Sequence, residues 1–320
     1  MDYIEKIIAD FNRGLPRALA RILTLIENRA DGYEDILGKL YRIKSSPSYR
    51  IGITGPPGAG KSTLVDRIAL HEKYLRREIG IVAVDPSSPF SGGAVLGDRV
   101  RMRDLAKREN IFIRSMASRG SFGGLSEATS DVMVAFEAFG KWLVIVETVG
   151  VGQVELDVVD TCDTVVVVLT PESGDTIQAL KSGIIEIADV FAINKSDRDG
   201  AEIFAVELRS ILDLKTKDER AWRVPVVPTV ATTGEGIDGL VEAIESHREF
   251  IVESGRFESH RIEQIEHKIN RIIASRIAKI VEERIDSGVD LSRLVQKVID
   301  GSEDPYSIAR ELLLLKEIDL

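Results

Sequence analysis

Residues 55–63 read GPPGAGKST and fit the pattern G-x-x-x-x-G-K-[S/T] at every fixed position. Glycines in such a loop let backbone N–H groups turn toward phosphate oxygens, an approach that a Cβ atom would obstruct. The apolar run at 50–54 predicts a strand before the loop, and 63–71 predicts a helix after it, whose positive N-terminus faces the phosphates. The segment therefore predicts a P-loop that binds a nucleoside polyphosphate with Mg²⁺.

Each residue of this loop is a candidate nucleotide contact. Lys61 is placed to reach the β- and γ-phosphates, and the Ser62 hydroxyl is placed on Mg²⁺. The full set of expected contacts in the loop is Gly55, Pro56, Pro57, Gly58, Ala59, Gly60, Lys61, Ser62 and Thr63.

Composition narrows the class of protein. The chain has 320 residues with 44% apolar content, enough for one large α/β domain with helical additions or for two small domains. A net charge of −10 argues against a nucleic-acid or anionic-membrane surface. The single cysteine, Cys162, excludes an internal disulfide, and we expect it to be buried. With no secretory signal and no apolar run long enough to cross a bilayer, we expect a cytoplasmic protein.

The chain divides into three expected parts. Residues 1–46 have apolar residues at helical spacing and predict an N-terminal helical extension. Residues 256–320 predict a C-terminal helical arm with two helices, at 258–285 and 302–318. Residues 47–255 alternate short β-branched runs with helices, which predicts a P-loop α/β domain with a mostly parallel sheet covered on both faces. The expected strands are 50–54, 80–84, 111–114, 142–147, 164–169, 190–194 and 226–230.

A guanine-reading motif follows one of these strands. Residues 194–197 read NKSD, in which Asp197 can accept hydrogen bonds from guanine N1–H and from its exocyclic amine. Adenine offers neither donor at those positions, and an unmatched buried group costs about 1–3 kcal/mol. We expect Asn194 to hold the loop and touch the base, and the stem of Lys195 to lie along the base plane.

The next loop supplies the other side of the base site. Residues 231–236 read ATTGEG after a predicted strand. Backbone N–H groups of Ala231, Thr232 and Thr233 are the expected contacts to the guanine oxygen. Together with NKSD, this loop predicts GTP and GDP as the ligands.

Acidic residues on the phosphate side predict a magnesium site. Asp85, Asp98 and Glu147 lie at strand ends or in glycine-rich loops, and with Ser62 they supply the hard oxygen ligands that Mg²⁺ prefers. Each acid could instead be a solvated loop residue. Glu147 opens ETVG, where the Gly150 N–H can meet the γ-phosphate. We take Lys61, Asp85 and Glu147 as the catalytic set.

The group that activates water is not identified by the sequence. Gln153 could orient a water molecule, but it falls three residues after Gly150. The arginine-rich run at 99–103 could act as an arginine finger, and a solvated helix face is the favoured interpretation. We expect slow hydrolysis that needs a partner.

Several unusual motifs together resemble one family. GPPGAGKST, AVDPSSPFSGGAVLGDRVRM, SRGSFGGLS, ETVGVGQVE, PESGDTIQALKSGI and NKSD are similar to the MeaB/ArgK family, the methylmalonyl-CoA mutase-associated GTPases, also called LAO/AO transport ATPases. The resemblance implies a usually homodimeric P-loop GTPase that gates cofactor delivery to an adenosylcobalamin-dependent acyl-CoA mutase and protects it. It also implies magnesium positions at Ser62, Asp98 and Glu147, with Asp85 in or near that shell. A third switch is implied at 171–182, containing Asp175, Gln178 and Lys181.

Two other functions stay open. One is a nucleotide-dependent regulator of lysine, arginine and ornithine transport, as the older family name implies. The other is a metallochaperone GTPase, which would need a histidine or cysteine cluster. The four histidines are dispersed at His71, His247, His260 and His267.

The C-terminal arm predicts a dimer. Apolar residues recur at helical spacing over about seven turns and form one stripe. Packing of part of the stripe on the chain's own GTPase domain is the alternative. The stripe consists of Ile262, Ile265, Ile269, Ile272, Ile273, Ile277, Ile280, Val281 and Ile285.

Overall fold

The computed structural model describes residues 3–43, 46–85, 105–117, 127–148, 156–171, 184–215, 221–286 and 290–314. The chain forms two compact units, Met1–Glu258 and Ser259–Leu320. In the described parts, no helix is both long enough and apolar enough to cross a membrane.

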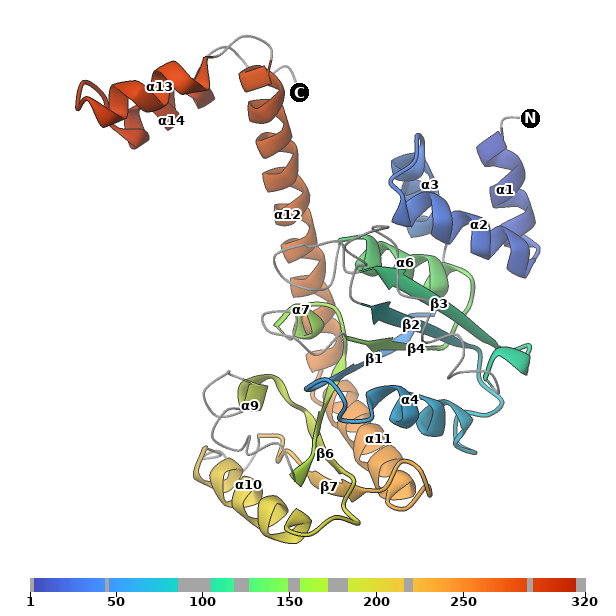
Figure 1. Cartoon of the computed structure of the whole chain (residues 1–320). Helices are drawn as coiled ribbons and strands as arrows, with labels where there is room; N and C mark the ends of the chain where they lie inside the picture. Colours follow the sequence, from blue (N-terminus) through green and yellow to red (C-terminus); the bar gives the residue numbers. More distant parts are fainter. Residues whose placement is uncertain are drawn as a thin grey trace. The chain divides into compact units, whose positions relative to one another are not determined.

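The first unit is built on a seven-stranded sheet in the order β3-β2-β4-β1-β5-β6-β7, with every neighbouring pair parallel (Figure 1). This confirms the predicted fold class. Each expected strand is present: two have the expected ends, and the ends of the other five differ by one to three residues. The strands are β1 (Tyr49–Thr54), β2 (Ile79–Asp85), β3 (Ile111–Ala117), β4 (Leu143–Glu147), β5 (Thr164–Leu169), β6 (Val190–Asn194) and β7 (Val226–Thr229).

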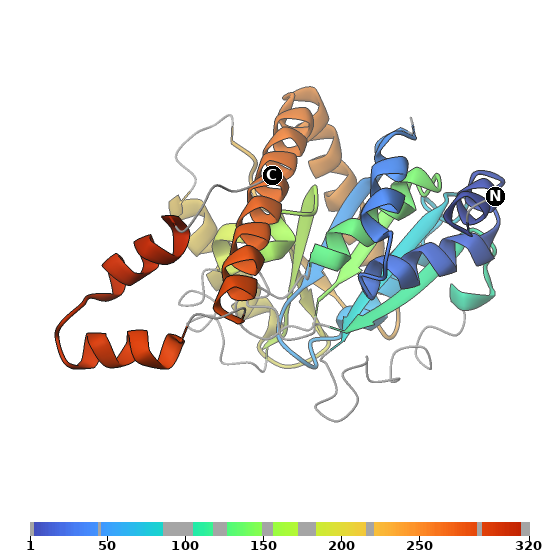
Figure 2. The same ribbon diagram turned by 90° about the horizontal axis from the view of Figure 1, so that it is seen from above.

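Both faces of the sheet are apolar because its strands are β-branched at consecutive positions. Along β5, Val165 and Val167 belong to one buried cluster, whereas Val166 and Val168 belong to the other. Helices cover each face, as Figures 1 and 2 show. The first cluster takes in α6 (Glu127–Ala138), α7 (Leu156–Val159), α9 (Ile184–Ile187) and α10 (Ala201–Lys215), and the second takes in α4 (Lys61–Leu70) and α11 (Ile237–Glu253).

Three N-terminal helices extend the first cluster: α1 (Tyr3–Asn12), α2 (Pro16–Glu27) and α3 (Tyr33–Tyr41). Leu19 and Ile22 of α2 are fully buried, in one cluster with Phe136 of α6. The Arg114 side chain of β3 donates to the Glu27 carboxylate, with Nε 3.0 Å from Oε2. These helices therefore share one hydrophobic core with α6 and one face of the sheet.

The described residues after Gly255 are mostly helical. They form α12 (Arg256–Asp286), α13 (Leu291–Ile299) and α14 (Pro305–Leu314). No separate helix was predicted over α13. This helix begins after Asp290, and the Asp290 side chain caps it by accepting from the Arg293 N–H at 3.1 Å. Six of the expected stripe residues on α12 are 39–58% exposed, namely Ile262, Ile265, Ile269, Ile272, Ile273 and Ile277.

Candidate nucleotide-binding site

The predicted P-loop joins the carboxyl end of β1 to α4. Gly55 has φ +136°, and a Cβ atom there would lie 2.1 Å from the Val168 carbonyl oxygen. Gly60 has φ +93° and caps α4, and a Cβ there would lie 2.3 Å from the Asn194 amide nitrogen. Both glycines are therefore required by backbone conformation and by space. The helix begins at Lys61, two residues earlier than expected, because the loop leads directly into its first turn.

Lys61 is almost fully buried against the loop that it serves. Its ammonium donates to the Gly55 carbonyl at 2.9 Å and to the Pro56 carbonyl at 3.1 Å. The charge is therefore held at the mouth of the loop, where a phosphate would bind.

Two of the four predicted magnesium ligands are in direct contact. Ser62 Oγ donates to Glu147 Oε1 at 2.6 Å, and the Glu147 side chain is buried. The contact arises because β4 lies beside β1 in the sheet, with Glu147 in register with Ile53. Thr148 extends the connection, since its hydroxyl donates to the Thr54 hydroxyl at 2.9 Å.

Asp85 ends β2, which is parallel to β4 and pairs with it on the side away from β1. The Asp85 backbone therefore lies at the same carboxyl edge of the sheet as Glu147. The Asp85 side chain is outside the described part of the structure. Several other predicted residues also lie outside the described residues: Asp98, Gly150, Gln153, Asp175, Gln178, Lys181 and the arginines of 99–103. Among the residues that are described, no three His, Cys, Asp or Glu side chains group as a metal site.

Asn194 ties the phosphate loop to the base loop. It is buried at the end of β6, and its Nδ2 donates to the Ala59 carbonyl at 2.7 Å. Its Oδ1 accepts from the Ala231 N–H at 3.0 Å. The structure thus brings together three predicted segments that are far apart in the sequence.

The rest of NKSD forms a constrained turn. Lys195 has φ +58°, a strained value for a residue with a Cβ atom. Ser196 holds the turn, since its N–H donates to the Thr229 carbonyl at 3.0 Å and its hydroxyl to the Ile193 carbonyl at 2.6 Å. Asp197 follows on the surface with an exposed side chain, available to a ligand.

Arg67 is a contact that the sequence did not predict. This residue of α4 donates from Nε to the Ala231 carbonyl at 2.8 Å and from Nη2 to the Thr232 carbonyl at 2.5 Å. The partners are 164 and 165 residues apart in the chain. Only the pairing of α4 with the β7–α11 loop, set by the fold, brings them together.

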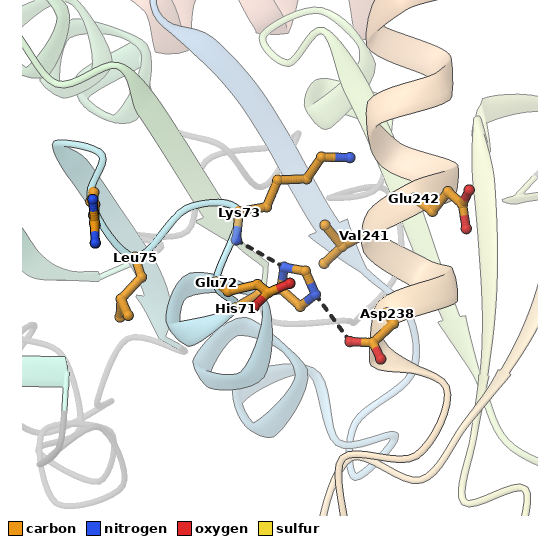
Figure 3. Close-up of a pocket in the computed structure, with 8 residues that line it drawn as sticks. His71, Glu72, Lys73, Leu75, Asp238, Val241 and Glu242 are labelled. Carbon is orange, nitrogen blue, oxygen red and sulfur yellow. Dashed lines mark hydrogen bonds and ion pairs between the residues drawn. The ribbon is translucent and has the colours of Figure 1, made fainter.

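A surface hollow of about 990 Å³ lies between the segment that follows α4 and the start of α11 (Figure 3). His71 points toward α11, and its Nε2 lies 3.0 Å from Asp238 Oδ1. No residue of the P-loop or of NKSD lines the hollow, which is therefore separate from the nucleotide site.

Comparison with known proteins agrees with this geometry. The family model described as "Methylmalonyl Co-A mutase-associated GTPase MeaB" matches residues 19–286. A putative GTPase of Pyrococcus abyssi is 45% identical, over 98% of this chain and 97% of its own length. The GTPase ArgK of Escherichia coli is 35% identical over 82% of this chain and 81% of its own.

Two further matches widen the comparison. A mouse protein named "Methylmalonic aciduria type A homolog, mitochondrial" is 31% identical over 97% of this chain and 79% of its own. The solved structure of a "LAO/AO transport system kinase" has a TM-score of 0.74 at 25% identity and covers 98% of this chain and 97% of its own. The chain therefore belongs to the MeaB family of methylmalonyl-CoA mutase-associated GTPases and is a P-loop GTPase.

Proposed function

We propose that this GTPase is a chaperone of an adenosylcobalamin-dependent acyl-CoA mutase of the methylmalonyl-CoA mutase type. It would gate loading of the cofactor and protect the mutase. The observation that carries the proposal is the family match over residues 19–286, whose description names association with that mutase. The mouse relative, whose printed name refers to methylmalonic aciduria, supports the same association.

The nucleotide chemistry rests on the contacts at the carboxyl edge of the sheet. Lys61 would hold the β- and γ-phosphates, and the Asp197 carboxylate would accept from guanine N1–H and the exocyclic amine. Asn194 would hold the phosphate loop and the base loop at a fixed separation, beside the base that it is expected to touch.

Magnesium fits the residues at this edge. Ser62 Oγ and Glu147 Oε1 are hard oxygen ligands 2.6 Å apart, and Asp85 and Asp98 complete the proposed set. A bound Mg²⁺ held by these oxygens would supply positive charge against the negative charge that develops on the phosphates during hydrolysis. The protein's part is to hold the ligands: the buried Glu147 is fixed by β4, and Ser62 is fixed by the first turn of α4.

The proposal includes a homodimer. The exposed isoleucines of α12 line one face at helical spacing, and a second copy of this chain would bury them. The α13 helix adds exposed apolar side chains at Leu291, Val295 and Ile299.

Coupling to the mutase is proposed for residues 171–182. A nucleotide shifts only what it binds differently in its two states, so coupling needs a segment whose contacts change with GTP and GDP. In the sequence, this segment begins two residues after the carboxyl end of β5, and it contains Asp175, Gln178 and Lys181.

Binding to purified methylmalonyl-CoA mutase tests the partner. The full chain is loaded with a non-hydrolysable GTP analogue or with GDP, and its affinity for the mutase is measured by calorimetry. The proposal expects a complex whose affinity or heat of binding differs between the two nucleotides. Absence of binding in both states would contradict it.

Transport regulation is the second candidate, because the solved relative is named a LAO/AO transport system kinase. A complex with a periplasmic or membrane component of amino-acid transport, in place of the mutase, would favour it. For a metallochaperone, nothing in the described residues adds support.

A further inference from the structure

The two hydrogen bonds from Arg67 end on the loop proposed to read the guanine oxygen. Its guanidinium is a planar fork, and two of its N–H groups reach adjacent carbonyls, those of Ala231 and Thr232. The same helix carries Lys61 and Ser62 in its first turn. Arg67 therefore connects the helix of the phosphate site to the base loop.

Of the three backbone N–H groups proposed for guanine, two already have partners. The Ala231 N–H donates to Asn194 Oδ1 at 3.0 Å, and the Thr233 N–H donates to the Val230 carbonyl at 3.1 Å. Within the described part of the chain, no protein acceptor is recorded for the Thr232 N–H. The Thr232 N–H is therefore the donor left for the guanine oxygen.

That N–H belongs to the same peptide unit as the Ala231 carbonyl. A trans peptide is planar, with its C=O and N–H pointing in opposite directions. Holding the oxygen with Arg67 Nε at 2.8 Å therefore aims the Thr232 N–H away from α4. A charged donor on the oxygen also polarises the amide and makes its N–H a stronger donor.

We propose that Arg67 is a positioning residue for guanine specificity, acting through the Ala231–Thr232 peptide on the purine 6-oxygen. The proposal rests on the proposed guanine site and adds a determinant outside its known motifs. Arg67 acts at a distance from the ligand and orients the donor that touches it.

The rest of the loop is held without Arg67. The Gly234 N–H donates to the Val230 carbonyl at 2.9 Å, and the Val230 N–H donates to the Glu235 carbonyl at 2.9 Å. Gly236 has φ +75°, and a Cβ there would lie 2.1 Å from the Pro228 carbonyl oxygen. Loss of Arg67 is therefore expected to release one peptide plane and leave the turn in place.

Affinity for three nucleoside diphosphates tests the proposal. Competition against a fluorescent GDP is measured with Mg²⁺ for GDP, for inosine diphosphate and for 2-aminopurine riboside diphosphate. Inosine keeps the 6-oxygen and N1–H and lacks the amine, whereas 2-aminopurine keeps the amine and lacks both the 6-oxygen and N1–H. The test variant is Arg67→Ala. Lys73→Ala is the control for loss of one positive charge, since the Lys73 side chain is exposed and lines the hollow between the segment after α4 and the start of α11.

Arg67→Ala is expected to weaken the binding of GDP and of inosine diphosphate about fivefold to tenfold, because the 6-oxygen of each nucleotide loses a well-aimed N–H donor of the protein. Affinity for the 2-aminopurine nucleotide should change less than twofold, and Lys73→Ala should change none of the three by more than that. If the alanine variant does not fold, the affinities for the same three nucleotides are measured with Arg67→Met, which keeps the packing of the aliphatic part of the arginine side chain.

An equal loss for all three nucleotides, or no loss for any, would overturn the role of Arg67. The parent chain gives a separate readout. If it binds GDP no better than the 2-aminopurine nucleotide, the guanine site itself fails, and the proposal for Arg67 fails with it.

Discussion

The Ser62 hydroxyl donates to the Glu147 carboxylate across 2.6 Å, joining the first turn of α4 to the end of β4. Both residues were predicted as magnesium ligands from motifs 85 positions apart. Their contact places two of the proposed magnesium ligands beside each other, at the end of the phosphate loop.

Replacing Glu147 tests the magnesium site. Glu147→Ala should raise the Mg²⁺ concentration needed for half-maximal GTP hydrolysis by at least about tenfold, since it removes a charged ligand. A magnesium titration of the steady-state rate measures this. Glu207→Ala, at an exposed acid of α10 outside the quoted motifs, is the control. An unchanged magnesium requirement in Glu147→Ala would remove Glu147 from the site.

Base specificity should follow Asp197. Asp197→Asn offers guanine a donor where guanine also donates, so GTP affinity should fall at least about tenfold. Xanthosine triphosphate, whose C2 oxygen is an acceptor, should gain affinity. Calorimetry with both nucleotides decides the matter, and unchanged GTP affinity would contradict the assignment. Asp199→Asn, on the same exposed turn, serves as the matched control.

The motifs of the nucleotide site were predictable because each is local in sequence. A P-loop needs glycines at fixed spacing, and Asn194 lies directly at the end of a strand. Arg67 could not be found in this way, since its partners are 164 and 165 residues away and are backbone carbonyls, which any residue type provides.

The strands were predicted for a similar reason. Continuous β-branched runs identify buried parallel strands, and their centres were correct. Their ends depend on neighbours: β7 stops at Thr229, because the Val230 N–H pairs with the Glu235 carbonyl in the following turn. The nine-residue α13 was missed because its helical pattern is short and lies between polar segments.

A buried hydrogen-bond chain at the amino edge of the sheet predicts a pH effect on stability. The hydroxyls of Tyr49 and Thr164 are hydrogen-bonded, and Thr164 Oγ1 lies 2.7 Å from His247 Nδ1. His247 Nε2 lies 3.3 Å from Asp189 Oδ1. Burial raises the pKa of Asp189 to about 7, and the nearby charge of Asp163 adds to the rise, against the lowering effect of the Val165 N–H.

The sign follows from proton binding. Between the unfolded pKa of 3.8 and about 7, the folded chain holds a proton on Asp189 that the unfolded chain has lost. The contribution of Asp189 to the free energy of unfolding should therefore fall as pH rises through this range. Its side chain is 31% exposed, so the slope should be well below the limit of about 1.4 kcal/mol per pH unit for one proton.

Asp189→Asn tests this directly. Urea unfolding at pH 5 and at pH 7 gives the free energy of unfolding of the parent and the variant. From pH 5 to pH 7, the free energy of unfolding of the variant should rise relative to that of the parent, because an amide carries no charge to bury. A difference that is independent of pH would contradict the raised pKa.

The exposed stripe of α12 predicts a dimer that one charge can disrupt. Ile269 and Ile273 are 51% and 50% exposed. Ile269→Asp and Ile273→Asp should each convert a dimer to a monomer at micromolar concentration in light scattering, since burying an unpaired charge is costly. Ala278→Asp places the same charge on the opposite face of α12 and should leave the dimer intact. A monomeric parent would rule out the dimer.

Steady-state GTP hydrolysis with and without methylmalonyl-CoA mutase tests the central claim most directly. The account predicts that the mutase raises the rate of the parent at least about tenfold. Lys181→Ala should keep its affinity for GTP and for the mutase and lose most of that increase, because the segment 171–182 is proposed to carry the coupling. Equal stimulation of parent and variant would remove Lys181 from the coupling. No stimulation of the parent by the mutase would contradict the proposed function.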